Sequence, residues 1–307
     1  MQRGQFGKIC QVRAWQGVLR NQPGCEMANA YEKRLLRVLE YIHANPAGDL
    51  SLDRLADVAA MSRFHWHRVF HAMTGETCAQ ATRRIRLHRA ACWLVQTDDP
   101  VAEVARRCGY PSAQSFTRAF GQVFGMSPGK FRKRGDLTSP SLYLRKGEYP
   151  VFPVEIITTR PRRLAAMAHK GPYLEIGAAF QQVASIFSAR NLWPKAQGMV
   201  GIYYDDPGLV APENLNSHAG VIVGDGFEMP ENLEDVQAPG GRMAVMHYKG
   251  PYAGLKAAYD YLFGEWLPNS GNEPRDAPSF EVYLNDPMDT APDDLLTDIC
   301  VPLQEEG

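Results

Sequence analysis

Polar side chains that follow Ser112 have the types and spacing needed to contact DNA bases. In a helix capped by Ser112, one face would bury Phe116, Ala119, Phe120 and Val123. The opposite face would carry Ala113, Gln114, Thr117 and Arg118, and no acidic residue. Arg can pair with guanine and Gln with adenine, each through two hydrogen bonds. We therefore expect this helix to read base edges in a major groove.

A helix-turn-helix is the structure that presents such a face to DNA. Asp99 and Pro100 are suited to start a preceding helix, which buries Val104 and ends at Gly109. The same pattern occurs earlier, with Ser51 starting a helix over 52–60 and Ser62 capping a second over 63–73 that ends at Gly75. The sequence thus predicts two tandem units, residues 51–75 and 99–125.

The second helix of the first unit has its own candidate reading face. Its outward residues are Arg63, Phe64, His67 and Arg68. Phe64 is suited to pack on a thymine methyl, whereas the second unit has the small Ala113 beside Gln114. We therefore assign the stricter base specificity to the helix that begins at Arg63. A helix over 79–96 would span roughly 27 Å and could place the two readers in successive major-groove segments, about 34 Å apart.

His65, His67 and His71 also suggest a metal site, because histidines at i and i+4 can share a ligand. The sequence offers no third ligand near them, and imidazoles that face DNA explain the set without a metal. We expect no metal and no cofactor.

Charge divides the chain into two halves. Residues 27–135 contain 17 Lys and Arg against 9 Asp and Glu, a net +8, whereas residues 150–307 contain 10 against 22, a net −12. The basic half is suited to a polyanion and the acidic half repels one. The arginines expected to contact phosphate are Arg83, Arg84, Arg86, Arg89, Arg106 and Arg107.

Length and cysteine usage indicate a cytoplasmic protein of several domains. The chain has 307 residues, and its six cysteines form no Cys-x-x-Cys pair, so neither a disulfide framework nor a zinc knuckle is indicated. No apolar run is long enough for a membrane helix or a signal peptide. Residues 1–27 are expected to be a disordered tail, with Met27 as an alternative start, and residues 135–150 a linker.

The acidic half contains an internal repeat. Arg163 to Tyr173 (RLAAMAHKGPY) returns as Arg242 to Tyr252 (RMAVMHYKGPY), and both copies continue into amphipathic helices. Downstream, GIYYDDP from Gly201 corresponds to EVYLNDP from Glu281. The unit is strand, strand, helix, strand, strand. We expect two such units to pair about a pseudo-twofold axis around a concave surface.

Both halves resemble known families. Residues 28–134, with the tail Phe124-Gly125-x-Ser127-Pro128-x-x-Phe131-Arg132, resemble the AraC/XylS transcription activators. Residues 151–303 resemble the GyrI-like effector-binding domains through the doubled Gly-Pro-Tyr and the strand from Phe280, in a Rob-type arrangement. The resemblance implies a multidomain fold: an all-α tandem helix-turn-helix domain, then an α+β domain of two ββαββ repeats. It also implies that Arg63, Phe64, His67, Arg68, Gln114, Thr117 and Arg118 contact DNA.

The resemblance places a carboxylate, Glu281, in the pocket where the repeats meet. The equivalent residue in the first repeat is Gly201, which would leave room for a ligand opposite the acid. Aromatic residues of both repeats are expected to line the pocket: Tyr173, Trp193, Tyr203, Tyr252, Trp266 and Tyr283. A carboxylate among aromatic rings favours a cationic or amphipathic effector. The alternative is that Glu281 is a solvated strand residue and the tyrosines are core.

These features together predict a bacterial transcription regulator, an activator, that binds double-stranded DNA and a small-molecule effector and works with RNA polymerase. We expect no membrane association, and two readers in one chain make a monomer sufficient, although the sequence leaves the oligomeric state open. One alternative is that the acidic half hydrolyses reactive small molecules, but no nucleophile-base pair is evident and we expect no enzyme. The other is that this half docks a protein or masks the basic half.

Overall fold

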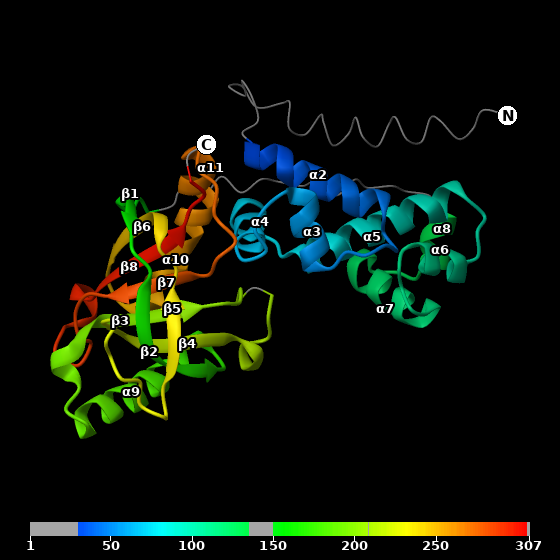
Figure 1. The fold of residues 1–307 in the computed structure, drawn as a ribbon. Helices are drawn as coiled ribbons and strands as arrows, with labels where there is room; N and C mark the ends of the chain where they lie inside the picture. The colour runs from blue at the N-terminus through cyan, green and yellow to red at the C-terminus, as the bar shows by residue number, and fades with distance from the viewer. Residues whose placement is uncertain (1–29, 135–149, 208, 306–307) are drawn as a thin grey trace. The chain divides into compact units, whose positions relative to one another are not determined.

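The computed structural model describes residues 30–134, 150–207 and 209–305 (Figure 1). The expected tail and most of the expected linker lie outside the described residues. The described chain forms two compact units: residues 30–59 with 78–134, and residues 60–77 with 150–305. No helix in the described ranges is long and apolar enough to cross a membrane.

The first unit is helical, as expected. Its elements are α2 (Ala30–Ala44), α3 (Leu52–Ala59), α5 (Cys78–Gln96), α6 (Val101–Arg107), α7 (Ala113–Phe124) and α8 (Pro128–Arg134). The expected helix-turn-helix helices correspond to α3, α4 (Trp66–Thr74), α6 and α7. By its contacts, α4 belongs to the second unit, although in sequence it lies between α3 and α5.

An aromatic core holds α7 on its neighbours. Phe116 and Phe120 are fully buried, and the ring of Phe120 packs on Phe124 and Phe131 with centroids 4.4 Å and 5.3 Å away. The Phe-Arg tail thus anchors α8 under α7. The expectation that Val123 is buried is wrong, since it is 55% exposed. The helical spacing places this residue at the margin of the apolar face.

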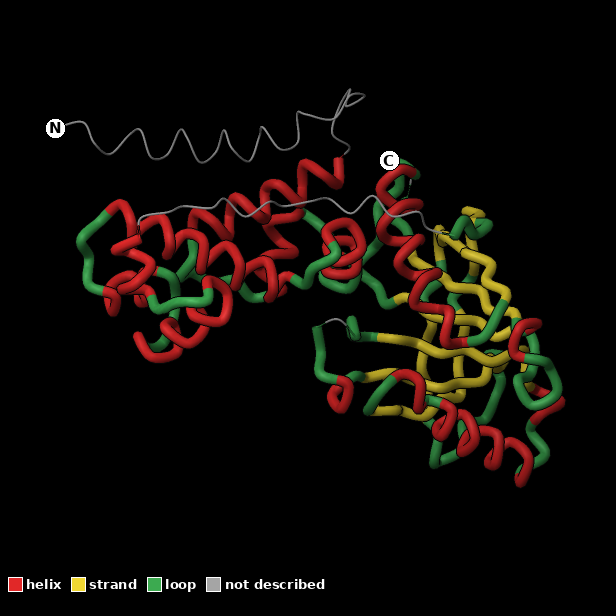
Figure 2. The backbone as a smooth tube through the Cα atoms, turned by 180° about the vertical axis from the view of Figure 1, so that it is seen from behind, coloured by secondary structure: helices red, strands yellow, loops and turns green. Residues whose placement is uncertain are grey.

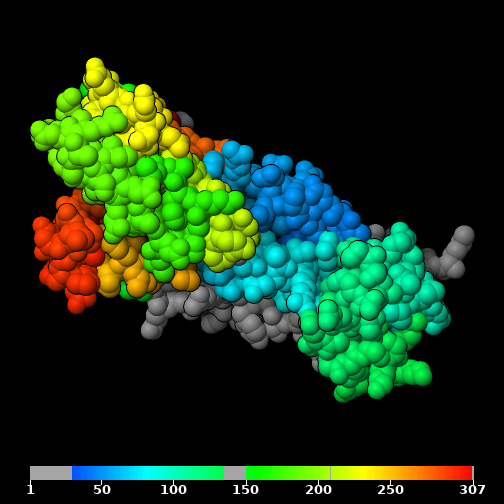
Figure 3. Space-filling view, turned by 90° about the horizontal axis from the view of Figure 1, so that it is seen from below, coloured from blue at the N-terminus to red at the C-terminus, as the bar shows by residue number. Residues whose placement is uncertain are grey.

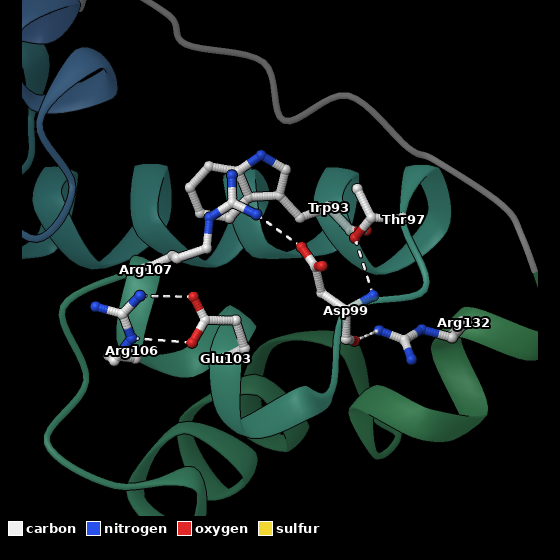
Figure 4. A network of polar contacts seen from close by, with 7 residues as sticks. All are labelled: Trp93, Thr97, Asp99, Glu103, Arg106, Arg107 and Arg132. Atoms are coloured by element: carbon white, nitrogen blue, oxygen red, sulfur yellow. Dashed lines mark hydrogen bonds and ion pairs between the residues drawn. The ribbon is translucent and has the colours of Figure 1, made fainter.

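Asp99 ties α5, α6 and α8 together (Figure 4). Its carboxylate accepts a hydrogen bond of 2.7 Å from Arg107, whose guanidinium lies 4.1 Å above the Trp93 ring. Arg132 donates to the main-chain carbonyl of Asp99 and to that of Leu94. Asp99 was expected to cap α6, but the cap position is Pro100 without a side-chain hydrogen bond. The Asp99 carboxylate forms an ion pair with Arg107 and does not cap α6.

The second unit is built on an eight-stranded antiparallel sheet. In chain order its strands are β1 (Val154–Thr159), β2 (Arg162–Lys170), β3 (Ala196–Tyr203), β4 (Asn216–Val223), β5 (Glu234–Ala238), β6 (Gly241–Lys249), β7 (Ser279–Tyr283) and β8 (Leu296–Pro302). The spatial order β1-β6-β8-β7-β3-β4-β2-β5 is unchanged when the two repeats are exchanged. This symmetry confirms the predicted pseudo-twofold relation.

The two repeats also exchange their first strands. β1 of the first repeat pairs with β6 of the second, and β5 of the second pairs with β2 of the first. Each exchanged strand brings a glutamate to a histidine: Glu155 lies 3.2 Å from His247, and Glu234 lies 3.1 Å from His218. The exchange interlocks the halves, so neither repeat has a complete sheet without the other.

Helices cover one face of this sheet (Figure 2). The first repeat supplies η1 (Tyr173–Glu175), α9 (Gly177–Ala189) and η2 (Trp193–Lys195), and the second supplies η4 (Tyr252–Gly254), α10 (Leu255–Tyr261), the π-helical η5 (Leu262–Trp266) and α11 (Leu267–Asn269). Two further single turns, η3 (Pro212–Asn214) and η6 (Pro292–Asp294), lie in the loops before β4 and β8. On the opposite face, Val200, Ile202, Phe280 and Val282 join one apolar cluster. Since side chains alternate along a strand, Gly201, Tyr203, Glu281 and Tyr283 face the helices.

Candidate DNA-reading helices and effector site

The candidate reading face of α7 is accessible at the surface of the first unit, where this segment appears turquoise-green in Figure 3. Gln114, Thr117 and Arg118 are exposed, and Ala113 is partly buried. The Oγ atom of Ser112 accepts a hydrogen bond of 3.1 Å from the Ser115 amide, which confirms the predicted cap. Gly125 ends the helix in the left-handed region, with φ of 68°.

The arginines expected to contact phosphate take part in contacts within the first unit. Arg86 donates to the carbonyl of Pro46, Arg89 to the carbonyl of His43, and Arg107 to Asp99. Arg83 donates to Gln122, and Arg106 pairs with Glu103, but both side chains remain exposed. Arg86, Arg89 and Arg107 therefore stabilise the fold. Phosphate contact stays a prediction, and the exposed Arg83 and Arg106 are better placed for it than these three.

Helix α4 begins three residues later than expected. It runs from Trp66, with His65 at the cap position, and ends at Gly75 with φ of 74°. Ser62 does not cap this helix. Its Oγ accepts from the Phe64 amide at 3.2 Å, which closes a turn, and donates to Asp276 at 2.9 Å.

The expected reading residues of α4 are engaged within the second unit. Nδ1 of His67 lies 2.9 Å from an Asp206 carboxylate oxygen, and the His67 side chain is 2% exposed. Arg68 donates to Ser279 Oγ at 2.6 Å and to the Asp205 carbonyl at 3.1 Å. Arg63 stays exposed, and its guanidinium lies 4.9 Å from the centroid of the Phe64 ring.

The three histidines of this segment have different surroundings. His65 is fully buried, its Nε2 donates to the Ala277 carbonyl at 2.9 Å, and its ring stacks on Phe263. Burial lowers the pKa of His65 to about 3, so its imidazole is neutral. His71 is partly exposed. Among the described residues, no three His, Cys, Asp or Glu side chains are grouped so that they could hold a metal ion.

Glu281 is buried at the junction of the two repeats. It is 4% exposed, and each of its carboxylate oxygens accepts a phenolic hydrogen bond of 2.9 Å, one from Tyr259 and one from Tyr283. The Tyr283 hydroxyl also lies 2.6 Å from that of Tyr203. The predicted aromatic surroundings of this carboxylate agree with the geometry, whereas a ligand pocket at Glu281 stays a prediction.

Burial and hydrogen bonding act in opposite directions on the Glu281 carboxyl. Desolvation raises its pKa, and the hydrogen bonds from tyrosines together with the nearby positive charge of Arg68 limit that rise. Desolvation also raises the pKa values of Tyr203, Tyr259 and Tyr283 far above the usual phenol value, and the Glu281 charge adds to this. The Glu281 carboxyl is therefore hydrogen-bonded to neutral phenols and has lost its hydration shell. A bound cation would stabilise its carboxylate form in place of water.

The space beside Glu281 is filled differently from the expectation. Gly201 pairs with Glu281 in the β3–β7 register. A Cβ atom at Gly201 would lie 2.9 Å from the hydroxyl oxygens of both Tyr203 and Tyr283. The expectation that Gly201 leaves room for a ligand is therefore corrected: in this structure the missing side chain makes room for the two hydroxyls that connect to Glu281.

Four of the predicted aromatic residues gather around this carboxyl. Tyr173 packs on Tyr203 with centroids 4.7 Å apart, and Tyr252 packs on Tyr283 at 5.6 Å. Trp193 lies elsewhere: its ring packs on Phe187, and its Nε1 donates to Ser188. Trp266 is partly exposed and makes no ring contact or hydrogen bond with the described site residues. The two tryptophans are thus not part of the group around Glu281.

Sequence reasoning missed Tyr259 and Phe180. Tyr259 donates to Glu281, and Phe180 meets the Tyr283 ring edge-on at 5.4 Å. The repeat contained the signal for both, because its offset of 79 residues maps Phe180 onto Tyr259. Tyr259 also lies seven residues after Tyr252, on the same helical face.

Two family models match the chain. A helix-turn-helix domain matches residues 55–134, and the GyrI-like small molecule binding domain matches residues 152–304. Three curated relatives illustrate the similarity. The DNA gyrase inhibitor of Yersinia enterocolitica is 31% identical over 137 residues, which are 43% of this chain and 86% of that protein.

The other two relatives come from Salmonella typhimurium. The multiple antibiotic resistance protein MarA is 30% identical over 95 residues, 31% of this chain and 75% of MarA. The transcriptional regulator Rob is 32% identical over 111 residues, 36% of this chain and 38% of Rob. The chain spans little more than a third of the length of several such relatives. The chain therefore belongs to the AraC-type helix-turn-helix family and carries, after that domain, a GyrI-like small molecule binding domain.

Proposed function

We propose that this protein is a sequence-specific transcription activator whose GyrI-like domain binds a small amphipathic cation. The observation that carries the proposal is Glu281, a carboxyl that is 4% exposed and surrounded by tyrosines where the two repeats meet. Burying a carboxylate is costly unless a cation or several donors accompany it. Phenol rings add the π-faces on which organic cations stack.

DNA recognition is assigned to the two reader helices. In α7, Gln114, Thr117 and Arg118 are exposed and suited to base edges and phosphates. In the first unit of the predicted pair, the proposed contacts are His67 and Arg68 in α4, and Arg63 and Phe64 in the turn that precedes it. As an activator the protein would act on RNA polymerase, and two readers in one chain allow it to bind as a monomer.

A mobility-shift titration with DNA from the region upstream of its own gene tests the DNA part of the proposal. We expect affinity to fall steeply as salt rises, since Lys and Arg displace counterions from phosphates. We also expect competitor DNA of scrambled sequence to be bound more weakly. Equal affinity for both sequences at every salt concentration would contradict sequence-specific regulation.

Calorimetric titration with tetraphenylphosphonium, a bulky aromatic cation, tests the effector part. We expect wild-type protein to bind it, and Glu281→Gln to weaken binding by about 30-fold, because an amide supplies no charge. Tetraphenylborate has the same shape and the opposite charge, and it should not bind. Binding that is unchanged in Glu281→Gln would remove Glu281 from the site.

We further propose that this site binds its ligand without turnover. Both oxygens of Glu281 are occupied by phenolic donors. The raised pKa values of Tyr203, Tyr259 and Tyr283 disfavour the phenolate that a nucleophile would need. With p-nitrophenyl acetate as substrate, wild-type protein should release nitrophenol no faster than the Glu281→Gln variant does. A rate that disappears in this variant would instead support hydrolysis.

A further inference from the structure

The guanidinium of Arg68 lies in a binding arrangement made by the GyrI-like domain. It donates to Ser279 Oγ at 2.6 Å and to the Asp205 carbonyl at 3.1 Å. Its carbon atom Cζ lies 5.2 Å from the centroid of the Tyr259 ring and 5.7 Å from that of Phe263. Two oxygen acceptors and two aromatic rings are what a planar cation with N–H donors requires.

This arrangement is connected to the proposed effector site. Ser279 lies two residues before Glu281 on β7, so both side chains point to the same face of the sheet. Tyr259 joins them directly, because its ring contacts Arg68 and its hydroxyl donates to Glu281 at 2.9 Å. The Asp205 carbonyl also accepts a hydrogen bond of 3.0 Å from Tyr173.

The rest of the α4 segment is held on the same domain by polar contacts. His67 contacts Asp206 at 2.9 Å, His65 donates to the Ala277 carbonyl, and Ser62 donates to Asp276. Two of the four residues proposed to read DNA, His67 and Arg68, are thereby occupied. In this arrangement they cannot also contact bases.

We propose that Ser279, Asp205, Tyr259 and Phe263 form a guanidinium subsite of the effector site, for which Arg68 and an amidinium- or guanidinium-bearing effector compete. The inference rests on the proposed function, because it extends the ligand from a general cation to a planar cation with N–H donors. An effector that displaces Arg68 removes a main anchor of α4 and frees this helix for DNA. Ligand binding and DNA reading are thus coupled through one side chain.

Titration of the full chain with benzamidine, an aromatic amidinium, tests the subsite. Arg68→Ala vacates it, and we expect benzamidine to bind this variant about tenfold or more tightly than wild type. Lys256→Ala is the matched control, since it removes a positive charge from the same domain on α10, where Lys256 pairs with Asp260. The control should bind benzamidine as wild type does. Circular dichroism verifies that both variants are folded.

Two results of this titration would overturn the subsite. One is equal affinity of wild type and Arg68→Ala, and the other is no binding of benzamidine to either. The proposed function is judged separately by tetraphenylphosphonium, which has no N–H donor and depends on Glu281. In another outcome, tetraphenylphosphonium binding is weakened in Glu281→Gln while benzamidine binds wild type and Arg68→Ala with equal affinity. In that case the proposed function stands and the guanidinium subsite does not.

A variant on the receiving side tests the coupling without changing any DNA-reading residue. Ser279→Ala removes an acceptor of Arg68, and we expect the ligand-free protein to bind DNA about tenfold more tightly. Ser217→Ala is the matched control, because Ser217 is an equally buried strand serine that contacts His169 instead. Identical DNA affinity of both variants, or weaker binding by Ser279→Ala, would contradict the competition.

Discussion

Gly201 faces Glu281 across the β3–β7 strand pair, at the centre of the pseudo-twofold sheet. The two residues are equivalent in the repeats, yet one has no side chain and the other has a buried carboxyl. The pair shows how the duplicated fold became asymmetric: the hydroxyls of Tyr203 and Tyr283 meet above Gly201 and connect to Glu281.

Replacing Gly201 should therefore disturb the site and the fold together. In Gly201→Ala, the new methyl group would lie 2.9 Å from both hydroxyl oxygens, so the tyrosines must move. We expect a loss of about 1–3 kcal/mol of unfolding free energy and weaker cation binding. Chemical denaturation and calorimetry measure the two effects.

Gly177→Ala is the matched control, since no atom outside its own helix backbone and its chain neighbours lies within 4 Å of the added methyl group. Gly177 begins α9, where Ala is the better helix former, so stability should rise by about 0.5–1 kcal/mol. If Gly201→Ala were as well tolerated as this control, the tyrosine hydroxyls would not be confined as described.

The Glu281 carboxyl should reduce stability at neutral pH while it supports binding. Its pKa is raised in the folded state by desolvation, so the folded protein binds more protons than the unfolded chain just above the ordinary Glu value. Stability should fall as pH rises through that window, whereas cation affinity should rise. Above that pH window, the melting temperature of Glu281→Gln should be no lower than that of wild type. The variant should also lack the drop in stability across the window, which thermal denaturation at a series of pH values will show. A clearly lower melting temperature would mean that the charge stabilises the fold.

Arg118 and Arg107 should separate DNA contact from structural support. Arg118 is exposed on α7, so Arg118→Ala should cost about 1–3 kcal/mol of DNA binding and leave the melting temperature unchanged. Arg107 joins Asp99 and Trp93, so Arg107→Ala should lose about 1–2 kcal/mol of stability. Mobility shift measures the DNA affinity of both variants, and thermal unfolding measures their stability. If Arg118→Ala lost stability and Arg107→Ala lost only DNA affinity, the two assigned roles would be wrong.

His247 should make the exchanged strand β1 sensitive to pH. Its pKa is raised chiefly by its hydrogen bond to Asp298, with Glu155 of β1 adding to the effect. A raised pKa means that the stabilisation is complete below about pH 6.5 and is lost as pH rises through the folded value. His247→Gln should remove this dependence from the melting temperature. His169→Gln is the control, because His169 bonds to the Ser217 hydroxyl and to no carboxylate in the described contacts.

Local patterns predicted most of the elements and, together with the family resemblance, most of the residues around Glu281. Caps and glycines located α7 and the end of α4, because these signals act within a few residues. The repeat predicted the symmetric sheet and, with the resemblance, Glu281 and four of its tyrosines. The expectation that Trp193 and Trp266 lie beside Glu281 is wrong, because the sequence of a repeat does not indicate the direction in which an aromatic side chain points. The exchange of β1 and β5 also has no local signal, because either partner strand would bury the same apolar residues.

The sequence by itself determined the helix-turn-helix elements, the doubled α+β fold and the acid at its centre. These follow from apolar periodicity, capping and repetition, which operate over short distances along the chain. Only the tertiary structure decided which groups meet: the phenols on Glu281, the arginines used by the first unit, and Arg68 on Ser279 and Tyr259. Arg68 and Ser279 are 211 residues apart in sequence. Such contacts depend on how whole elements pack, which no local pattern specifies.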